Sequence, residues 1–456
     1  MKYAILLTLV FTASLSAADT HYVSPAGSNE QPYWTWETAA HVIQDAIDVA
    51  AAGDVILVTN GTYSTGGKAG YATGGNAGQV TRVVLNKAVT LRSVNGPDVT
   101  TVQGATPVRC VYVGDGATIE GFTLSGARQS TWFDGGGIYM TGGGRAFNCV
   151  VESNHGNSGG GVYGGTIHNS IIRANWANKN GGGAYNSTLV NCIIVNNDAD
   201  AYFSSGGGGT YGGVSSNCTY AGNSTVGNGG GAYGGRLINC IVYHNSDGNT
   251  YGSDCSHCCT IPLPSGTGNI EAPPLMVDWV NGDYTLQSNS PCIDVGMFAS
   301  GGDFSGTPRP LDGDNDSSLG SDIGAYELVN PMADSDQDGL LDTIEISGLH
   351  GTSAVKADTD GDHQNDGDEV VAGTSPTSAD SVFRILSLAR SDGTAALTWS
   401  TVNLRGYRVQ IAEAVSGPWS NLFGFAVYEL DEAPEGTETI LHEQQGPPRF
   451  YKVVIE

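Results

Sequence analysis

Apolar residues in the middle of the chain form short, mostly β-branched runs that are broken by glycine and asparagine at a regular interval. One phrase, three glycines, a further residue and a tyrosine, recurs every 22 to 26 residues and ends at Tyr139, Tyr163, Tyr185, Tyr211 and Tyr233. A fixed period of this size without helical spacing of apolar positions is typical of a solenoid. Short β-branched runs separated by turn residues predict that its coils are made of strands.

A second phrase with asparagine at both ends follows each copy. Stacked coils place equivalent positions about 4.8 Å apart, so these asparagines should form two ladders at the corners, where asparagine tolerates a left-handed backbone. The opening asparagines are Asn148, Asn169, Asn191, Asn217 and Asn239, and the closing ones are Asn154, Asn175, Asn197, Asn223 and Asn245. The pattern predicts a parallel β-helix, and it leaves open whether the tyrosines pack inside or form an outer ladder.

Cysteines follow several of the opening asparagines, in a column with parallel side chains that should be buried and free of disulfides. This column holds Cys149, Cys192, Cys218 and Cys240. Four further cysteines near the last coil are better candidates for disulfides in an exported protein, namely Cys255, Cys258, Cys259 and Cys292. A metal site at Cys255, His257 and Cys258 is disfavoured because no second pair of ligands accompanies it.

The N-terminal segment indicates export. Lys2, an apolar run over 4–11 and small residues at 16–18 predict a signal peptide over residues 1–18. The run is too short to span a membrane, so we expect a secreted or cell-surface protein with no membrane span in the mature chain.

An entrance cap should follow, with a strand at 21–24, helical spacing of apolar residues over 38–51 and a buried strand at 55–58. The stretch "YVSPAGS…TWETAAHVIQDAIDVAAAGDVILVTNGTY" resembles the start of secreted bacterial right-handed β-helix proteins of the pectin-lyase-like superfamily. This resemblance implies an all-β fold and a right-handed coil.

Charge is strongly unbalanced, with 46 acidic against 19 basic residues and a net charge of −27. Much of the excess lies between Asp303 and Glu369. Such a balance argues against nucleic acid and anionic membranes as partners and favours cations.

The acidic segment contains two twelve-residue loops that match a calcium-binding pattern. The expected ligands of the first loop are Asp334, Asp336, Asp338, Leu340 through its carbonyl, Asp342 and Glu345. Those of the second loop are Asp358, Asp360, Asp362, Gln364, Asp366 and Glu369, and His363 takes the turn position that glycine usually fills. A shorter run, Asp312 to Asp316, lacks the final glutamate and stays undecided.

Both loops, "DSDQDGLLDTIE" and "DTDGDHQNDGDEVVAGTSPTSADS", resemble thrombospondin type 3 repeats of bacterial surface proteins. The resemblance implies calcium as the cofactor. Two alternatives are a solvated acidic linker and a dockerin pair with a cohesin partner, although the expected helices look short for a dockerin.

The remaining segments complete the domain plan. Residues 303–327, "DFSGTPRPLDGDNDSSLGSDIGAYE", resemble the closing part of a choice-of-anchor Q domain, which marks proteins displayed at the cell surface. Alternating apolar residues after 381 predict a small antiparallel sandwich that resembles fibronectin-like modules. We therefore expect a signal peptide at 1–18, a capped right-handed β-helix at 19–300, a closing segment at 301–330, calcium repeats at 331–380 and a β-sandwich at 381–456.

Catalytic residues are not identified. Asp198, Asp200 and Arg173 are the nearest approach to an acidic catalytic set, and a solvated surface explains them more simply. Aromatic residues in the loops before the triple glycines form a candidate glycan-binding face, or else pack back onto the coil; they are Trp132, Phe133, Trp176, Tyr202 and Phe203.

Three functions follow from the sequence. The leading hypothesis is a calcium-binding surface protein that binds polysaccharide or a cell-envelope glycan, or mediates adhesion. The alternatives are a secreted polysaccharide lyase or glycoside hydrolase, and a structural envelope protein.

Overall fold

The computed structural model describes residues 18–69, 76, 78–129, 132–200, 206–402, 406–422, 427–428, 435–443 and 449–455. Nearly all of the expected signal peptide therefore lies outside the described residues. The chain divides into two compact units. The first runs to Met297 and includes Asp303–Ser305 and Ile323–Tyr326, and the second holds Phe298–Gly302, Gly306–Asp322 and Glu327–Glu456.

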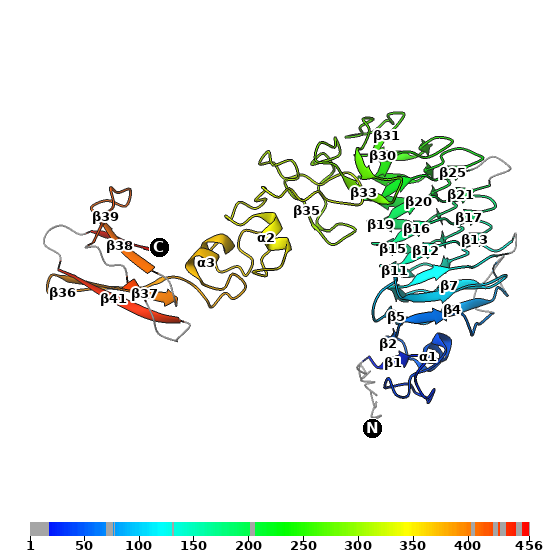
Figure 1. Ribbon diagram of the computed structural model, residues 1–456, viewed down its shortest axis with the longest axis horizontal. Helices are drawn as coiled ribbons and strands as arrows, with labels where there is room; N and C mark the ends of the chain where they lie inside the picture. The colour runs from blue at the N-terminus through cyan, green and yellow to red at the C-terminus, as the bar shows by residue number, and fades with distance from the viewer. Residues whose placement is uncertain are drawn as a thin grey trace, which may run out of the picture. The chain divides into compact units, whose positions relative to one another are not determined.

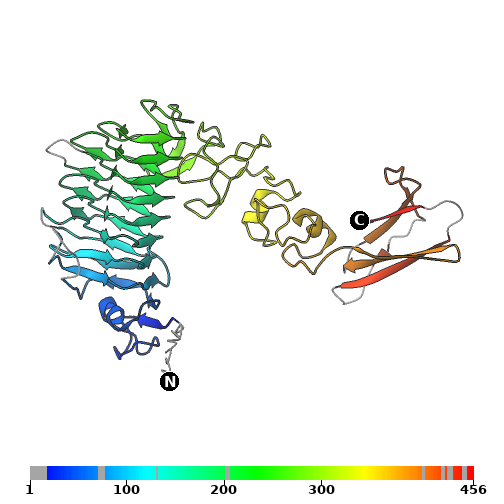
Figure 2. The same cartoon turned by 180° about the vertical axis from the view of Figure 1, so that it is seen from behind.

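Parallel sheets build the first unit, and their strands stack coil upon coil (Figures 1 and 2). Sheet 1 contains β1 (Thr20–Val23), β2 (Val55–Val58), β5 (Thr90–Ser93), β8 (Thr118–Glu120), β11 (Arg145–Phe147), β15 (Thr166–His168), β19 (Thr188–Val190), β23 (Val214–Ser216), β27 (Arg236–Ile238) and β30 (Asp254–Ser256). Sheet 2 contains β4 (Thr81–Leu85), β7 (Arg109–Val113), β10 (Ile138–Met140), β14 (Val162–Tyr163), β18 (Ala184–Tyr185), β22 (Thr210–Tyr211), β26 (Ala232–Tyr233) and β29 (Thr250–Tyr251).

Two further sheets complete the coil. Sheet 3 contains β3 (Gly61–Tyr63), β6 (Thr100–Gln103), β9 (Thr123–Ser125), β12 (Val150–Glu152), β16 (Ile171–Arg173), β20 (Ile193–Val195), β24 (Thr219–Ala221), β28 (Ile241–Val242) and β31 (Cys259–Thr260). Sheet 4 contains β13 (His155–Gly156), β17 (Trp176–Ala177), β21 (Asp198–Ala199) and β25 (Ser224–Thr225). The predicted parallel β-helix is confirmed.

The opening asparagines turn the chain between sheets 1 and 3. All five have left-handed backbones, with φ between 47° and 52° in Asn148, Asn169, Asn191, Asn217 and Asn239. Asparagine suits this corner because its short polar side chain lowers the cost of the left-handed conformation. This ladder is confirmed.

The closing asparagines also form a ladder, and only their backbone conformation differs from the prediction. The left-handed residue of that corner lies one position earlier, as in Ala174 (φ 52°) and Asn196 (φ 54°). The closing asparagines instead point inward, and each side-chain amide donates to the next one, for example from Asn175 to Asn197 at 3.0 Å and from Asn197 to Asn223 at 3.0 Å. The ladder is therefore a buried polar row that satisfies its own amides.

All nine cysteines are buried and free. The prediction for the interior column is thus confirmed, whereas the structure pairs none of the four candidates for disulfides. Cys258 follows a left-handed His257 (φ 51°), as Cys240 follows Asn239, so it extends the buried column into the last coil. Burial raises the pKa of Cys149 to about 11, which keeps this thiol neutral at physiological pH.

The tyrosines form an outer ladder, which decides between the two alternatives. Neighbouring rings stack in register on sheet 2, with centroids 5.0 Å apart between Tyr139 and Tyr163 and 5.2 Å apart between Tyr185 and Tyr211. Because each ring covers the face of the next, the ladder presents ring edges to solvent.

A cap closes the first coil. Helix α1 (Ile43–Val49) is shorter than the predicted segment and buries Ile43, Ala46 and Ile47 in the same apolar core as the coil interior. The helix lies at the N-terminal end of the stack (Figure 1). Such a cap protects the end of a solenoid from pairing with other chains.

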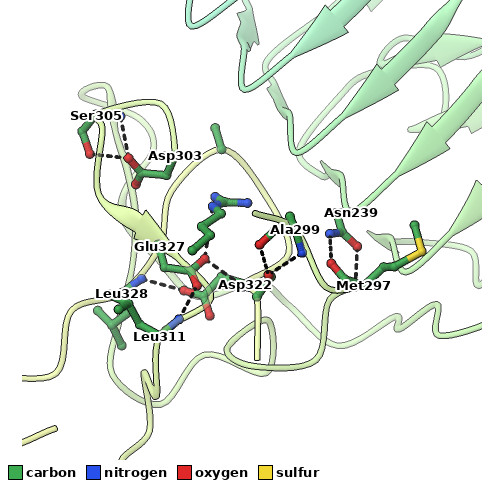
Figure 3. A network of polar contacts seen from close by, with 12 residues as sticks. Asn239, Met297, Ala299, Asp303, Ser305, Leu311, Asp322, Glu327 and Leu328 are labelled. Carbon is green, nitrogen blue, oxygen red and sulfur yellow. Dashed lines mark hydrogen bonds and ion pairs between the residues drawn. The ribbon is translucent and has the colours of Figure 1, made fainter. Parts of the chain in front are cut away.

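After the last coil the chain returns over the outside of sheet 3. The antiparallel hairpin of β32 (Met276–Asp278) and β33 (Asp283–Leu286) contributes to an apolar cluster with Ile193, Val195 and Ala325. Asn239 exchanges two hydrogen bonds of 2.6 Å with the backbone of Met297 (Figure 3). These contacts fix the returning segment to the coil.

The second unit begins with a buried polar network, and its described residues contain two short helices and three antiparallel sheets. The Nε atom of Arg309 lies 3.2 Å from Oε2 of Glu327, and both side chains are about 1% exposed. Glu327 accepts from the amides of Leu311 and Asp322, as Figure 3 shows. The remaining elements of this unit are β34 (Gly301–Gly302), β35 (Pro308–Arg309), α2 (Asp342–Ile346) and α3 (Asp366–Ala372).

The C-terminal strands form the predicted sandwich-like pair of antiparallel sheets. One contains β36 (Ile385–Ser391), β37 (Thr394–Val402) and β41 (Glu435–Glu443), and the other β38 (Gly406–Ala412), β39 (Ser420–Asn421), β40 (Val427–Tyr428) and β42 (Phe450–Ile455). Trp399 and Tyr407 are buried in a common core. The described residues include no helix long and apolar enough to cross a membrane.

Candidate metal centres and ligand-binding faces

The first acidic loop folds around its own carboxylates. Asp334 accepts hydrogen bonds from the amides of Asp338 at 3.1 Å and Gly339 at 3.0 Å, which closes the turn. Carboxylate oxygens of Asp334, Asp336 and Asp338 lie within 4.8 Å of one another. The turn needs a left-handed residue, and Gly339 supplies it with a φ of 100°.

Several buried oxygens of this loop have no hydrogen-bond partner in the described structure. They are both oxygens of Asp336, one of Asp338 and both of Glu345. Burial and the neighbouring aspartates raise the pKa of Asp336 to about 7 and that of Glu345 to about 8. Unpaired buried carboxylates are costly, so the donor set fits a hard cation that would bind these oxygens.

The second loop repeats this arrangement 24 residues later. Asp358 accepts from the amides of Gly361 at 2.7 Å and His363 at 2.9 Å. His363 is left-handed with a φ of 80°, as expected for the position that Gly339 holds in the first loop. The buried oxygens without a hydrogen-bond partner here are one each of Asp360 and Asp362 and both of Glu369.

Leu340 and Gln364, at the seventh position of each loop, make equivalent backbone contacts. The amide of Leu340 donates to Asp338 at 2.7 Å, and the amide of Gln364 donates to Asp362 at 2.8 Å. Their backbones therefore pass directly beside the aspartate clusters, where a carbonyl ligand would be needed.

The ninth positions brace the loops. Both oxygens of Asp342 accept from Ser335, through its amide and its hydroxyl, each at 2.7 Å. Asp366 accepts from Thr359 in the same way, at 2.8 and 2.6 Å. These carboxylates thus hold the start of each loop against the helix that follows it.

Asp366 also reaches the first loop. One of its oxygens lies within 4.8 Å of ligand atoms of Asp338 and Glu345, and all three residues are buried. The adjoining Gly367 approaches so closely that a Cβ atom there would lie 2.2 Å from the carbonyl oxygen of Asp338. The sequence pattern predicts two separate sites, and only the fold shows that Asp366 of the second loop lies beside Asp338 and Glu345 of the first.

Trp176 lies in a column of mixed polar residues on sheet 4. It pairs in register with His155 and Asp198, and Ser224 follows Asp198 in the next coil. Its indole stacks on the His155 ring with 4.2 Å between centroids and is 38% exposed. Burial lowers the pKa of His155, which favours a neutral ring in this stack.

The other expected aromatic residues do not extend that column. Trp132 is 76% exposed and Phe133 is half-buried, in the loop before Gly135. Tyr202 and Phe203 lie outside the described residues. The structure therefore describes an exposed tryptophan and a stacked one, and it places His155 and Asp198, rather than another of the expected aromatic residues, beside Trp176.

The acidic residue Asp198 and the arginine considered for catalysis lie on different sheets. Asp198 in sheet 4 accepts from the Ser224 hydroxyl at 2.9 Å. Arg173 in sheet 3 pairs with Glu152 at 2.7 Å. The structure thus engages Asp198 and Arg173 with other partners.

No protein-family model and no curated protein matches the chain. Among solved structures, pectate lyase Pel9A is 16% identical, with a TM-score of 0.41 over 69% of this chain and 98% of that one. The pectin methylesterase PemA from Erwinia chrysanthemi is 12% identical, with a TM-score of 0.28 over 55% and 81%. The pectin methylesterase from carrot is 11% identical, with a TM-score of 0.30 over 57% and 79%. Matches at this level carry no argument about activity.

Proposed function

We propose that this chain is a secreted or cell-surface protein that binds calcium through its two acidic loops and binds polysaccharide through its β-helix. The observation that carries the calcium assignment is the set of buried carboxylate oxygens without hydrogen-bond partners in Asp336, Glu345 and Glu369. A folded protein rarely buries such groups unless a cation or a proton joins them.

The chemistry of the donors favours calcium over other metals. Both loops offer carboxylates and backbone carbonyls, and calcium takes six to eight oxygen ligands in flexible geometry. Transition metals prefer nitrogen and sulfur ligands. His363 of the second loop occupies the left-handed turn position that Gly339 holds in the first loop, so we assign it a backbone role and not that of a metal ligand. The resemblance to thrombospondin type 3 repeats supports the same assignment.

The polysaccharide assignment rests on the β-helix surface. Trp132 and Trp176 expose indole rings on a rigid stack of coils. Aromatic rings combine a large apolar face with a polar edge, which suits the C–H faces and hydroxyls of sugars.

Calorimetric titration with calcium tests the metal assignment. Replacement of Asp334, Asp338 and Glu345 together by the amides should abolish binding at the first site. The matched control replaces three exposed acids elsewhere, Glu30, Asp98 and Glu271, and should leave binding unchanged. If the unaltered protein gives no heat of binding at millimolar calcium, the segment is better interpreted as a solvated acidic linker.

Retention on immobilised polysaccharides, neutral, acidic and sulfated, tests the second assignment. Trp132→Ala and Trp176→Ala should each weaken retention without lowering stability by more than about 0.5 kcal/mol, because both side chains are partly exposed. Release of unsaturated or hydrolysed products would instead support the enzyme alternative. Unchanged retention in both variants would move binding away from these tryptophans.

A further inference from the structure

A cleft of about 260 Å³ opens on the outside of sheet 3, beside the returning hairpin. Strands β16 and β20 form one side, and the turn of β32–β33 with Tyr326 forms the other. Ile193 and Val195 give it an apolar floor, since both are almost fully buried beneath the hairpin. All of these residues belong to the first unit.

Two tyrosines supply flat walls and free hydroxyls. Tyr284 is 8% exposed, and Tyr326 is half-buried. Neither hydroxyl forms a hydrogen bond with another described residue, neither is among the fully enclosed polar atoms, and both tyrosines line the cleft. A ligand can therefore gain two hydrogen bonds here without displacing protein partners.

An ion pair lies at the rim. Arg173 donates through Nε to Glu152 at 2.7 Å, and its side chain remains 50% exposed. The two terminal nitrogens of Arg173 have no partner among the described residues. The exposed amide of Asn196 also borders the cleft, on a left-handed backbone with a φ of 54°. The rim thus offers donors and acceptors in close proximity.

The electrostatic surroundings favour an uncharged ligand. Burial, Asp303 and Asp283 together raise the pKa of Tyr326 to about 12, which shows that negative charge lies near this wall. Glu152 already neutralises Arg173. These nearby carboxylates would repel an anion, and the guanidinium that lines the cleft would repel a cation. A neutral molecule with several hydroxyls avoids both penalties.

Size limits the ligand to one ring. Pockets for drug-sized molecules measure about 300–1,000 Å³, so this smaller cleft suits a single unit of a larger chain. We infer that the cleft binds one neutral sugar ring, at the end or on a side branch of a polysaccharide. This inference rests on the proposed polysaccharide binding and gives it a second site and a substrate class. Ring C–H groups would pack on the tyrosines and the aliphatic floor while hydroxyls bond to the rim.

Saturation-transfer-difference NMR on the full chain with calcium present tests this site. The probes are glucose, galactose, mannose and xylose, with galacturonate as the anionic comparison. We expect at least one neutral sugar to receive saturation from the protein. Tyr284→Phe and Tyr326→Phe should each weaken its binding about 3- to 10-fold, since each removes one hydroxyl.

Two further variants separate the cleft from other surfaces. Tyr185→Phe, in the outer tyrosine ladder, is the matched control and should leave sugar binding unchanged. Val280→Trp places a large ring at the cleft mouth, where Val280 is 72% exposed, and should abolish binding without disturbing the core.

The outcomes distinguish this inference from the proposed function. Absence of saturation for all four neutral sugars, stronger binding of galacturonate, or unchanged binding in the two Tyr→Phe variants would each overturn the cleft as a neutral-sugar site. Polysaccharide retention measured in parallel reports on the proposed function separately. Retention that survives Val280→Trp but fails in Trp132→Ala and Trp176→Ala would leave that function standing with the cleft excluded.

Discussion

At the scale of single residues, the position of a carboxylate in a motif does not fix what it does. Asp342 and Asp366 hold the same motif position, and each braces its own loop through Ser335 or Thr359. Only Asp366 also lies beside Asp338 and Glu345. The sequence shows the repeat, but the contact between repeats depends on how the second helix approaches the first loop.

Asp366→Asn should therefore affect both proposed calcium sites. We expect the affinity of each site to fall by about tenfold, because one variant weakens the bracing of the second loop and removes charge from the first. Calorimetric titration checks this, with Asp368→Asn as the control because Asp368 is exposed on the same helix. An effect confined to one site would contradict the shared carboxylate.

Glu327 should make the closing network sensitive to pH. Burial and Asp322 raise its pKa to about 8 from an ordinary 4.5, despite the nearby Arg309. For a carboxyl with a raised pKa in the folded state, the stabilising contribution is complete below about 4.5 and is lost as pH rises towards about 8.

Hydrogen exchange of residues 309–328, corrected for intrinsic rates, measures this dependence. Between pH 5 and 8.5 the network should lose stability of the order of 4 kcal/mol. Glu327→Gln carries no ionisable group and should remove most of the trend. If the network becomes more stable over the same interval, the pKa of Glu327 is lowered by folding and not raised.

At the scale of elements, the sequence predicted the features that recur in each coil, but it did not predict contacts between residues that are far apart in the chain. Triple glycines, tyrosines and opening asparagines recur at one period, so the coil and its left-handed corner could be derived from them. The inward direction of the closing asparagines could not, because a period gives a column without saying which way its side chains point. The cleft brings Ile171 to Tyr326, which no local pattern connects.

The closing asparagines should contribute strongly to coil stability. Asn197 accepts from Asn175 and donates to the Ile172 carbonyl at 2.8 Å. Asn197→Ala would leave the buried backbone N–H of Asn175 without its acceptor and would remove a donor from the Ile172 carbonyl, at a cost of about 2–4 kcal/mol in unfolding free energy. Denaturant unfolding checks this. As the control, Asn95→Ala at an exposed position should change stability by less than about 0.5 kcal/mol. An equal loss of stability in both variants would show that the asparagine ladder does not stabilise the coil.

At the scale of the whole molecule, apolar and acidic content are separated along the chain. The first unit has a continuous apolar core from Val23 to Cys258. Residues 334–380 have few apolar side chains and bury carboxylates instead, including Asp338, Asp342, Glu345, Asp366 and Glu369. The β-helix should therefore fold without a metal, whereas the acidic segment needs a cation to offset its charge.

Limited proteolysis of the full chain, with calcium and with a chelator, tests this central claim most directly. We predict that chelation exposes residues 334–380 to cleavage and releases the C-terminal sandwich, while residues 19–300 stay resistant. Replacement of Asp334, Asp338 and Glu345 should reproduce cleavage in the first loop even in excess calcium. The same cleavage pattern with and without chelator would contradict the account.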